Sequence, residues 1–230
     1  MTITTASGVH GTQLAEFAFL GLLAFTKDLP RLLLDKAERR WGHYPVDELR
    51  GQTILIVGFG SIGKEIGRLG RAFGMRVIGV NRSGIGGSSN ADEIHAPGSL
   101  DDLLPLADAV VLSMPSTGET RLMFDAHAFG LMRANAIFVN VGRGAVVDED
   151  ALVSALKDGR LRGAVLDVFA TEPLPVGSAL WDLPNVLVSP HTAALSRREN
   201  ARIVDLFAEN LRRFLASEAL VNRVDPDLLY

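Results

Sequence analysis

Four polar side chains in the second half of the sequence lie at or just beyond the ends of short apolar runs: Arg143, Asp167, Glu172 and His191. A guanidinium, carboxylates and an imidazole can together bind an anion and move a proton at neutral pH. Each residue taken singly has a simpler explanation, such as a surface ion pair, a turn or a bond to backbone. If the apolar runs are neighbouring parallel strands, however, their carboxyl ends share one edge, and the four side chains converge there.

Six strand-like segments alternate with helix-like segments in the middle of the chain. The predicted strands are Thr53–Gly58, Arg76–Val80, Ala109–Ser113, Ile137–Val141, Gly163–Val168 and Val186–Ser189. The predicted helices include Ile62–Phe73, Leu100–Leu104, Asp148–Lys157 and Arg202–Leu215. Parallel strands need crossover connections, which helices provide. The pattern therefore predicts an α/β protein with a doubly wound parallel sheet of six or more strands and helices on both faces.

A glycine-rich turn joins the first predicted strand to the first of these helices. Gly58, Gly60 and Gly63 have the spacing G-x-G-x-x-G. The first glycine permits a tight turn, the second lets the backbone approach a pyrophosphate, and the third lets helix and strand pack closely. The N–H groups at the start of the helix then face the anion. A turn needed for packing alone leaves this spacing unexplained, so we expect a Rossmann-type nicotinamide-dinucleotide site.

The end of the second predicted strand bears on which dinucleotide is bound. Sites that select NAD place an acidic residue there, which accepts hydrogen bonds from the ribose. This sequence has Asn81, Arg82 and Ser83 instead. All three can donate to a 2′-phosphate, and Arg82 adds a positive charge. We expect NADP or NAD, with NADP favoured; the alternative is that Arg82 stacks on the adenine without a strong preference.

The composition argues against several classes of protein. The chain has 230 residues, 47% hydrophobic and 22% charged, with a net charge of −4 at pH 7. No basic tract points to a nucleic acid partner. The absence of cysteine rules out disulfides and thiolate metal sites. His10, His43, His95 and His127 lack metal-ligand spacing, so no metal is expected, and a cytoplasmic location is the simplest.

The segment Leu14–Leu34 is rich in Leu, Phe and Ala. Charged residues and a proline interrupt it, so no apolar stretch reaches the ~20 residues of a membrane span, and no membrane partner is expected. The segment is predicted to be one helix with a large buried face. Phe17, Leu20, Leu23 and Ala24 cover more than one side of that helix, which therefore needs partners on several sides.

Five further stretches carry a resemblance to a known family. They are Ser7–Gly11 (SGVHG), Met114–Thr120 (MPSTGET), Val139–Asp148 (VNVGRGAVVD), Gly163–Pro173 (GAVLDVFATEP) and Pro184–Ala193 (PNVLVSPHTA). In this order, and with the glycine turn, they resemble the D-isomer-specific 2-hydroxyacid dehydrogenases, which include glyoxylate/hydroxypyruvate reductases and phosphoglycerate dehydrogenases. The resemblance implies an NAD(P)-dependent oxidoreductase that transfers a hydride between the cofactor and a small 2-keto or 2-hydroxy acid.

The resemblance also assigns roles to individual residues. Arg143 matches the arginine that grips the substrate carboxylate, and its planar fork of donors suits that task. His191 matches the acid/base and Glu172 the carboxylate that orients it. Asp167 matches the residue that contacts the nicotinamide amide. The expected cofactor contacts are Gly58, Gly60, Ser61, Ile62, Gly63, Asn81, Arg82, Ser83, Met114, Pro115, Thr120, Val141, Gly142, Arg143, Asp167, His191 and Ala193.

The family normally carries a substrate domain before its cofactor domain, and this sequence resembles the family only from the end of that domain onward. We expect residues 1–41 to be an interdomain or dimerisation helix segment, 42–195 the dinucleotide-binding domain, and 196–230 a C-terminal helix that returns toward the substrate domain. A site without that domain stays open to water, so poor turnover is expected, along with exposed apolar surface on Arg202–Leu215. Family members dimerise through the first region, which implies a homodimer. The alternative function is a truncated, non-catalytic NAD(P)-binding dimeric module.

Overall fold

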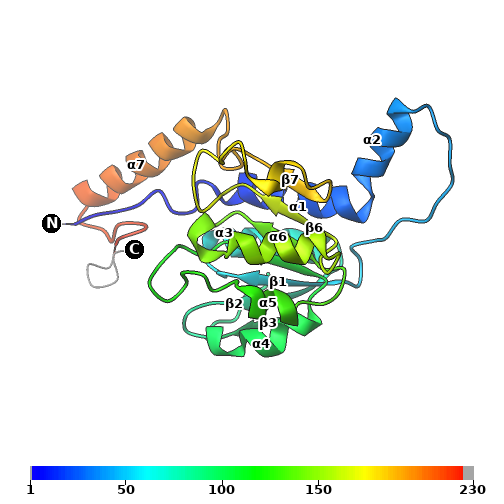
Figure 1. Ribbon diagram of the computed structural model, residues 1–230. Coiled ribbons are helices and arrows are strands. Elements are labelled where there is room, and N and C mark those ends of the chain that lie inside the picture. The colour runs from blue at the N-terminus through cyan, green and yellow to red at the C-terminus, as the bar shows by residue number, and fades with distance from the viewer. Residues whose placement is uncertain (1, 225–230) are drawn as a thin grey trace.

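Seven parallel strands form one sheet in the computed structural model, which describes residues 2–224 (Figure 1). The strands are β1 (Thr53–Val57), β2 (Arg76–Val80), β3 (Glu93–His95), β4 (Ala109–Leu112), β5 (Ile137–Asn140), β6 (Gly163–Leu166) and β7 (Val186–Val188). Their order is β3-β2-β1-β4-β5-β6-β7, and every ladder is parallel. The predicted doubly wound α/β sheet is confirmed. The additional strand, β3, is a three-residue edge strand without the apolar run that identified the other six.

Helices cover both faces of this sheet (Figure 1). The α-helices are α1 (Gly11–Thr26), α2 (Leu29–Ala37), α3 (Ser61–Ala72), α4 (Leu100–Leu103), α5 (Ala126–Leu131), α6 (Glu149–Lys157) and α7 (Glu199–Leu215). Short 3₁₀ helices occupy η1 (Pro97–Ser99), η2 (Leu104–Leu106), η3 (Gly144–Val146) and η4 (Ala179–Trp181). The apolar sides of α1 and α3 pack on one face of the sheet, and those of α4, α5 and α6 pack on the other.

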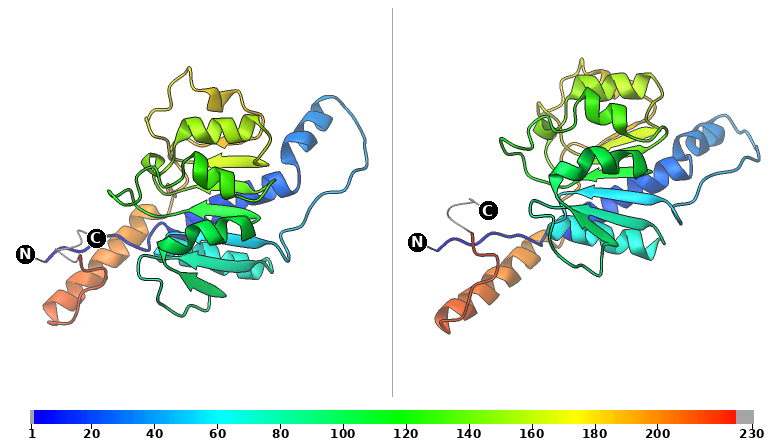
Figure 2. Two further views of the ribbon diagram at one scale, coloured as in Figure 1. Left: turned by 60° about the horizontal axis from the view of Figure 1, so that its bottom comes forward. Right: turned by 90° about the horizontal axis from the view of Figure 1, so that it is seen from below.

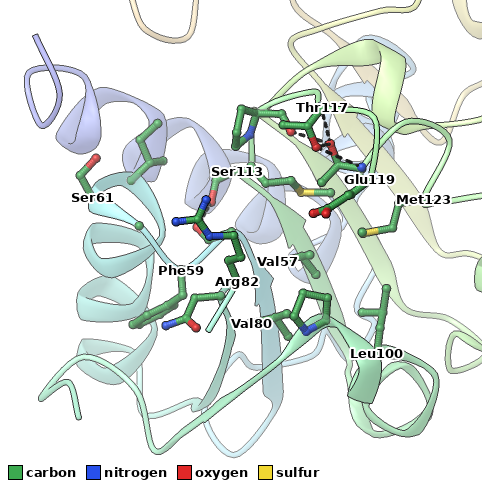
Figure 3. Close-up of a pocket in the computed structure, with 18 of the residues that line it drawn as sticks. Val57, Phe59, Ser61, Val80, Arg82, Leu100, Ser113, Thr117, Glu119 and Met123 are labelled. Atoms are coloured by element: carbon green, nitrogen blue, oxygen red, sulfur yellow. Dashed lines mark hydrogen bonds between the residues drawn. The ribbon is translucent and has the colours of Figure 1, made fainter. Parts of the chain in front are cut away.

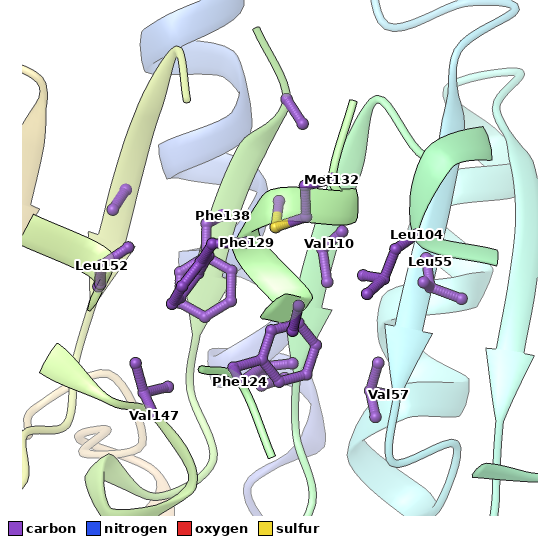
Figure 4. Close-up of a cluster of buried hydrophobic side chains, with 14 of the residues drawn as sticks. Leu55, Val57, Leu104, Val110, Phe124, Phe129, Met132, Phe138, Val147 and Leu152 are labelled. Carbon is purple, nitrogen blue, oxygen red and sulfur yellow. The ribbon is translucent and has the colours of Figure 1, made fainter. Parts of the chain in front are cut away.

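The larger of the two hydrophobic layers is built around three phenylalanines (Figure 4). Phe138 of β5 is fully buried, and its ring lies 5.6 Å from Phe124 and 5.2 Å from Phe129, centroid to centroid. Tilted and edge-on ring pairs of this kind add to the stabilisation from buried apolar area. This cluster holds β5 and the loop before α6 together beneath the carboxyl edge of the sheet.

The segment Leu14–Leu34 is two helices, so the prediction of one continuous helix is wrong. The break falls at Lys27 and Asp28, and Asp28 has a left-handed φ of 53°. Pro30 lies in the first turn of α2, where its missing N–H costs nothing, whereas a proline inside a continuous helix would remove a hydrogen bond and clash with the preceding turn. α1 is largely buried, but none of the residues of α2 is. No helix within residues 2–224 has both the length and the apolarity of a membrane span.

α2 and α7 project from opposite ends of the molecule (Figures 1 and 2). α7 begins at Glu199, three residues before the predicted start, and Val204, Phe207 and Phe214 on it are more than 60% exposed. The expected exposed apolar surface on this helix is therefore confirmed. The segment that precedes α1 runs beside α7, and Thr4 pairs with Arg223 in an antiparallel bridge. The proposed division at residues 41 and 195 stays a prediction, and residues 1 and 225–230 lie outside the described part of the chain.

Candidate active site

The topology places the glycine turn at the point where the strand order reverses, because β1 is flanked by β2 on one side and β4 on the other. Gly58 has a φ of 98°, and a Cβ on it would lie 2.5 Å from the backbone nitrogen of Met114. The Ser113 hydroxyl donates to the Gly58 carbonyl over 2.9 Å. The ends of β1 and β4 are thus locked together around a position that only glycine can occupy.

A cavity of about 670 Å³ opens above these strand ends (Figure 3). Nine of the predicted cofactor contacts line it: Gly58, Gly60, Ser61, Ile62, Asn81, Arg82, Met114, Pro115 and Thr120. Other residues line it as well, although they were not among the predicted cofactor contacts: Val57, Phe59, Pro97, Leu100, Thr117, Glu119 and Met123. The other predicted contacts lie outside this lining: Gly63, Ser83, Val141, Gly142, Arg143, Asp167, His191 and Ala193.

The cavity fits the nucleotide part of a dinucleotide. A Cβ on Gly60 would meet nothing within 4 Å, so the backbone at the start of α3 is open to a ligand. No side chain caps this helix start, which leaves its N–H groups for an anion. A Cβ on Gly63 would lie 2.5 Å from the Gly58 carbonyl oxygen, so this glycine permits the close approach of helix and turn. Arg82 extends over the cavity from the end of β2 (Figure 3).

Asn81 and Ser83 form a turn of their own beside the cavity. The Asn81 side-chain oxygen accepts from the Gly84 backbone N–H at 2.7 Å and from the Ser83 hydroxyl at 3.2 Å. Asn81 and Arg82 line the cavity, and Ser83 is not among its lining residues.

His191 and Glu172, from the loops after β7 and β6, are hydrogen-bonded, with 2.7 Å between Nδ1 and Oε2. The other Glu172 oxygen accepts from the Phe169 backbone N–H at 2.9 Å. Burial alone would raise the pKa of Glu172, but the hydrogen bonds from His191 and Phe169 and the charges of His191 and Arg143 outweigh it and hold that pKa below its usual range. Glu172 is thus an ionised carboxylate at neutral pH, and it accepts the hydrogen bond that fixes the orientation of the His191 ring.

Asp167 shapes the loop that carries His191. This buried carboxylate accepts three hydrogen bonds at Oδ1, from the Ser189 hydroxyl (2.5 Å) and from the backbone N–H groups of Thr192 (2.9 Å) and Ala193 (3.0 Å). His191 itself has a left-handed φ of 55°, a conformation that costs a non-glycine residue free energy. The bonds on both sides of His191 hold it in that conformation.

Asn140, which the sequence analysis did not assign, supports the loop that carries Arg143. It is buried at the end of β5, where its side-chain oxygen accepts from the Gly142 N–H (3.0 Å) and its amide donates to the Arg143 carbonyl (3.1 Å). The Arg143 guanidinium donates to the Gly142 carbonyl over 2.7 Å. A polar residue that ends an apolar strand run was the available signal, since a buried amide must be hydrogen-bonded.

The structure thus brings Arg143, Asp167, Glu172 and His191 to one edge of the sheet, the edge that also carries the glycine turn. A guanidinium and a hydrogen-bonded imidazole–carboxylate pair thus lie at the same edge of the sheet as the cavity. Within residues 2–224, no cluster of three or more His, Cys, Asp or Glu side chains could hold a metal ion.

Residues 19–193 match the family model described as "D-isomer specific 2-hydroxyacid dehydrogenase, NAD binding domain". A glyoxylate reductase from Aeropyrum pernix is 36% identical over 99% of this chain and 70% of its own length. A solved D-isomer specific 2-hydroxyacid dehydrogenase from Xanthobacter autotrophicus, in complex with NADPH and MES, is 31% identical with a TM-score of 0.86, covering 100% of this chain and 94% of that one. An NADPH-dependent glyoxylate/hydroxypyruvate reductase from Sinorhizobium meliloti, in complex with NADP and sulfate, is 30% identical with a TM-score of 0.89, covering 100% and 73%.

Proposed function

Because this chain belongs to the family of D-isomer specific 2-hydroxyacid dehydrogenases, NAD(P)-dependent enzymes, we propose that it interconverts a small 2-keto acid and its D-2-hydroxy acid at the carboxyl ends of β5, β6 and β7. One observation carries this proposal: the His191–Glu172 pair, joined over 2.7 Å, stands close enough to Arg143 for the arginine's charge to lower the pKa of Glu172. These three side chains could bind a substrate carboxylate and supply a proton, as the reduction of a carbonyl beside a nicotinamide requires.

In the proposed reaction each side chain acts on a different part of the substrate. Arg143 binds the carboxylate and polarises the neighbouring carbonyl. When bound, NAD(P)H supplies the hydride. His191 donates a proton to the oxygen that becomes the hydroxyl, and in the reverse direction it removes that proton. Glu172 keeps the imidazole oriented through its hydrogen bond to Nδ1.

The remaining predicted cofactor contacts have places in this proposal. The second oxygen of Asp167 is assigned to the nicotinamide amide, since the three bonds described above all reach Oδ1. Val141 and Gly142, both buried after β5, are assigned to the nicotinamide pocket, as is Ala193. Gly63 acts through the packing of α3 on the turn rather than by contact.

We assign the cofactor preference to NADP. The sequence at the end of β2 has no carboxylate to repel a 2′-phosphate, and Arg82 lines the cavity there. The relatives from Xanthobacter and Sinorhizobium were solved with NADPH and NADP, which is consistent with this preference. Parallel fluorescence titrations with NADPH and NADH test it, and tighter binding of NADH would overturn the assignment.

We propose glyoxylate and hydroxypyruvate as the first substrates to assay, following the names of the relatives. The test follows the oxidation of NADPH with each acid in the wild type and in His191→Ala. We expect turnover in the wild type that falls about a hundredfold or more in the variant, because a positioned acid contributes 10²–10⁴-fold. Cofactor binding without turnover of any 2-keto acid would instead support the non-catalytic module.

A homodimer through α1 and a cytoplasmic location stay predictions. Sedimentation that detects only monomer would contradict the homodimer.

A further inference from the structure

Glu149, the first residue of α6, reaches out of its own helix to the loop after β6. Its Oε1 accepts a hydrogen bond from the backbone N–H of Ala170 over 2.5 Å. An acid at this position would be expected to interact with the N–H groups at the start of its own helix. That role belongs to Asp148, which caps the helix by accepting from the Ala151 N–H. Glu149 is therefore available to act on a different segment.

The segment that Glu149 holds is the loop that carries Glu172, the hydrogen-bond partner of His191. The neighbouring backbone N–H, that of Phe169, donates to Glu172 over 2.9 Å, and Glu172 pairs with His191 over 2.7 Å. Two consecutive N–H groups therefore point at two carboxylates. A displacement of the Ala170 peptide would carry the Phe169 N–H with it and weaken its bond to Glu172.

The segment that precedes Glu149 is firmly anchored in the protein core. Val146 and Val147, just before α6, are 0% and 2% exposed. The Asp148 N–H donates to the Phe124 carbonyl over 2.9 Å, which ties the helix start to the aromatic cluster. Arg143 lies on the same loop as these residues, so a contact from Glu149 to Ala170 fixes the distance between the Arg143 loop and the Glu172 loop.

We propose that Glu149 is a positioning residue, which anchors the Ala170 peptide so that Glu172 and His191 keep their place relative to Arg143. The catalytic part of this inference rests on the proposed function. The structural part, that Glu149 orders the loop, does not.

Two substitutions at position 149 separate the effect of side-chain length from the effect of side-chain charge. Glu149→Asp keeps the negative charge at the helix start but shortens the side chain by one methylene, so the carboxylate no longer reaches Ala170. Glu149→Gln removes the charge but keeps an oxygen acceptor at full length. Asp150→Ala is the matched control, because Asp150 is the next acid in the same first turn and is exposed.

The first readout needs no activity: amide hydrogen exchange of Phe169 and Ala170 in the full chain. Loss of a hydrogen bond to a charged acceptor should accelerate exchange of these amides about tenfold or more in Glu149→Asp, with much smaller effects in Glu149→Gln and Asp150→Ala. Equal protection in Glu149→Asp and the wild type, or greater loss in Glu149→Gln than in Glu149→Asp, would overturn the proposal.

The second readout is the pH dependence of kcat/KM for NADPH-driven reduction. A loosened Phe169 N–H no longer favours the ionised form of Glu172, so the pKa of Glu172 rises and the acidic limb of the profile moves to higher pH in Glu149→Asp, with kcat about tenfold lower. A merely structural role would leave that limb unmoved, and this result would limit Glu149 to stability. If the wild type turns over no 2-keto acid, the proposed function fails, whereas the exchange result still decides the loop anchor.

Discussion

A methyl group on Gly144 would strike the loop that carries Glu172. A Cβ at this position would lie closer than 3.0 Å to the carbonyl carbon and oxygen of Phe169 and to the nitrogen of Ala170. All three are backbone atoms, so no side chain can turn aside. Gly144→Ala therefore forces the loop that follows Arg143 and the loop that precedes Glu172 apart by about 1 Å.

The size of the effect follows from that displacement. Forcing atoms into a packed region costs typically 1–3 kcal/mol, and a backbone obstacle belongs at the upper end, so we expect about 3 kcal/mol. For a chain of this size the melting temperature then falls by about 6–12 °C. A misplacement of about 1 Å at a reacting centre can cost 10²-fold in rate, so kcat/KM should fall about a hundredfold while NADPH still binds, because the nucleotide cavity lies beside other loops.

The assay compares melting, NADPH affinity and kcat/KM in the wild type, Gly144→Ala and Gly177→Ala. Gly177 is the matched control, since a Cβ there would meet nothing within 4 Å. If Gly144→Ala melts within about 2 °C of the wild type, the smallest shift expected for 1 kcal/mol, and keeps its kcat/KM, then the two loops do not touch and the reasoning fails.

Three further predictions test other parts of the molecule. Arg82→Ala should weaken NADPH binding about tenfold or more and NADH binding much less, and equal losses in the two titrations would contradict a role at the 2′-phosphate. Phe138→Ala should lower the free energy of unfolding in urea by about 3–5 kcal/mol, because the ring is fully buried against two others; a loss below about 1 kcal/mol would mean that the layer repacks. Glu172→Gln should destabilise the chain by about 1 kcal/mol or less at pH 7, since the carboxylate is partly exposed. The pKa of Glu172 in the folded chain lies below its ordinary 4.5, so this stabilisation is full above pH 4.5 and is lost as the pH falls through the folded pKa. In urea unfolding, the difference in stability between the wild type and Glu172→Gln should therefore shrink at acid pH rather than grow.

The sheet could be predicted from the sequence because its strands are buried on both sides and therefore read as continuous apolar runs. β1, β2 and β4 to β6 lie inside the sheet and have this property. The edge strand β7 is half-buried but still reads as an apolar run, whereas the edge strand β3 has Glu93 and His95, both half-buried. The break between α1 and α2 depends on Asp28, which adopts a left-handed conformation. Apolar residues resume on the far side of the break, so hydrophobicity alone did not divide the segment; Pro30 was the local sign that a new helix begins there.

The residues proposed to do chemistry could be predicted, whereas the residues that support their loops could be predicted only in part. Arg143, Glu172 and His191 are recognisable because each follows a strand and because few residue types can bind an anion or transfer a proton. Asn140 bonds backbone atoms only two and three positions away, and a polar residue at the end of an apolar strand was its signal. The Glu149 contact crosses 21 positions of sequence, and no local pattern encodes it.

These supports nevertheless share a physical logic. Each loop of the candidate site is held by a polar side chain at the end of a rigid element: Asn140 ends β5, Asp167 follows β6, and Glu149 begins α6. A buried strand end or a helix start has a fixed position, and a side chain there can satisfy N–H groups that a neighbouring loop would otherwise leave unpaired. The positions of the site loops are therefore set by the rigid strands and by the start of α6, because one hydrogen-bonded residue ties each loop to one of these elements. If this is correct, substitutions at these three positions should disturb the Arg143, His191 and Glu172 loops respectively, and hydrogen exchange should localise each loss to its own loop.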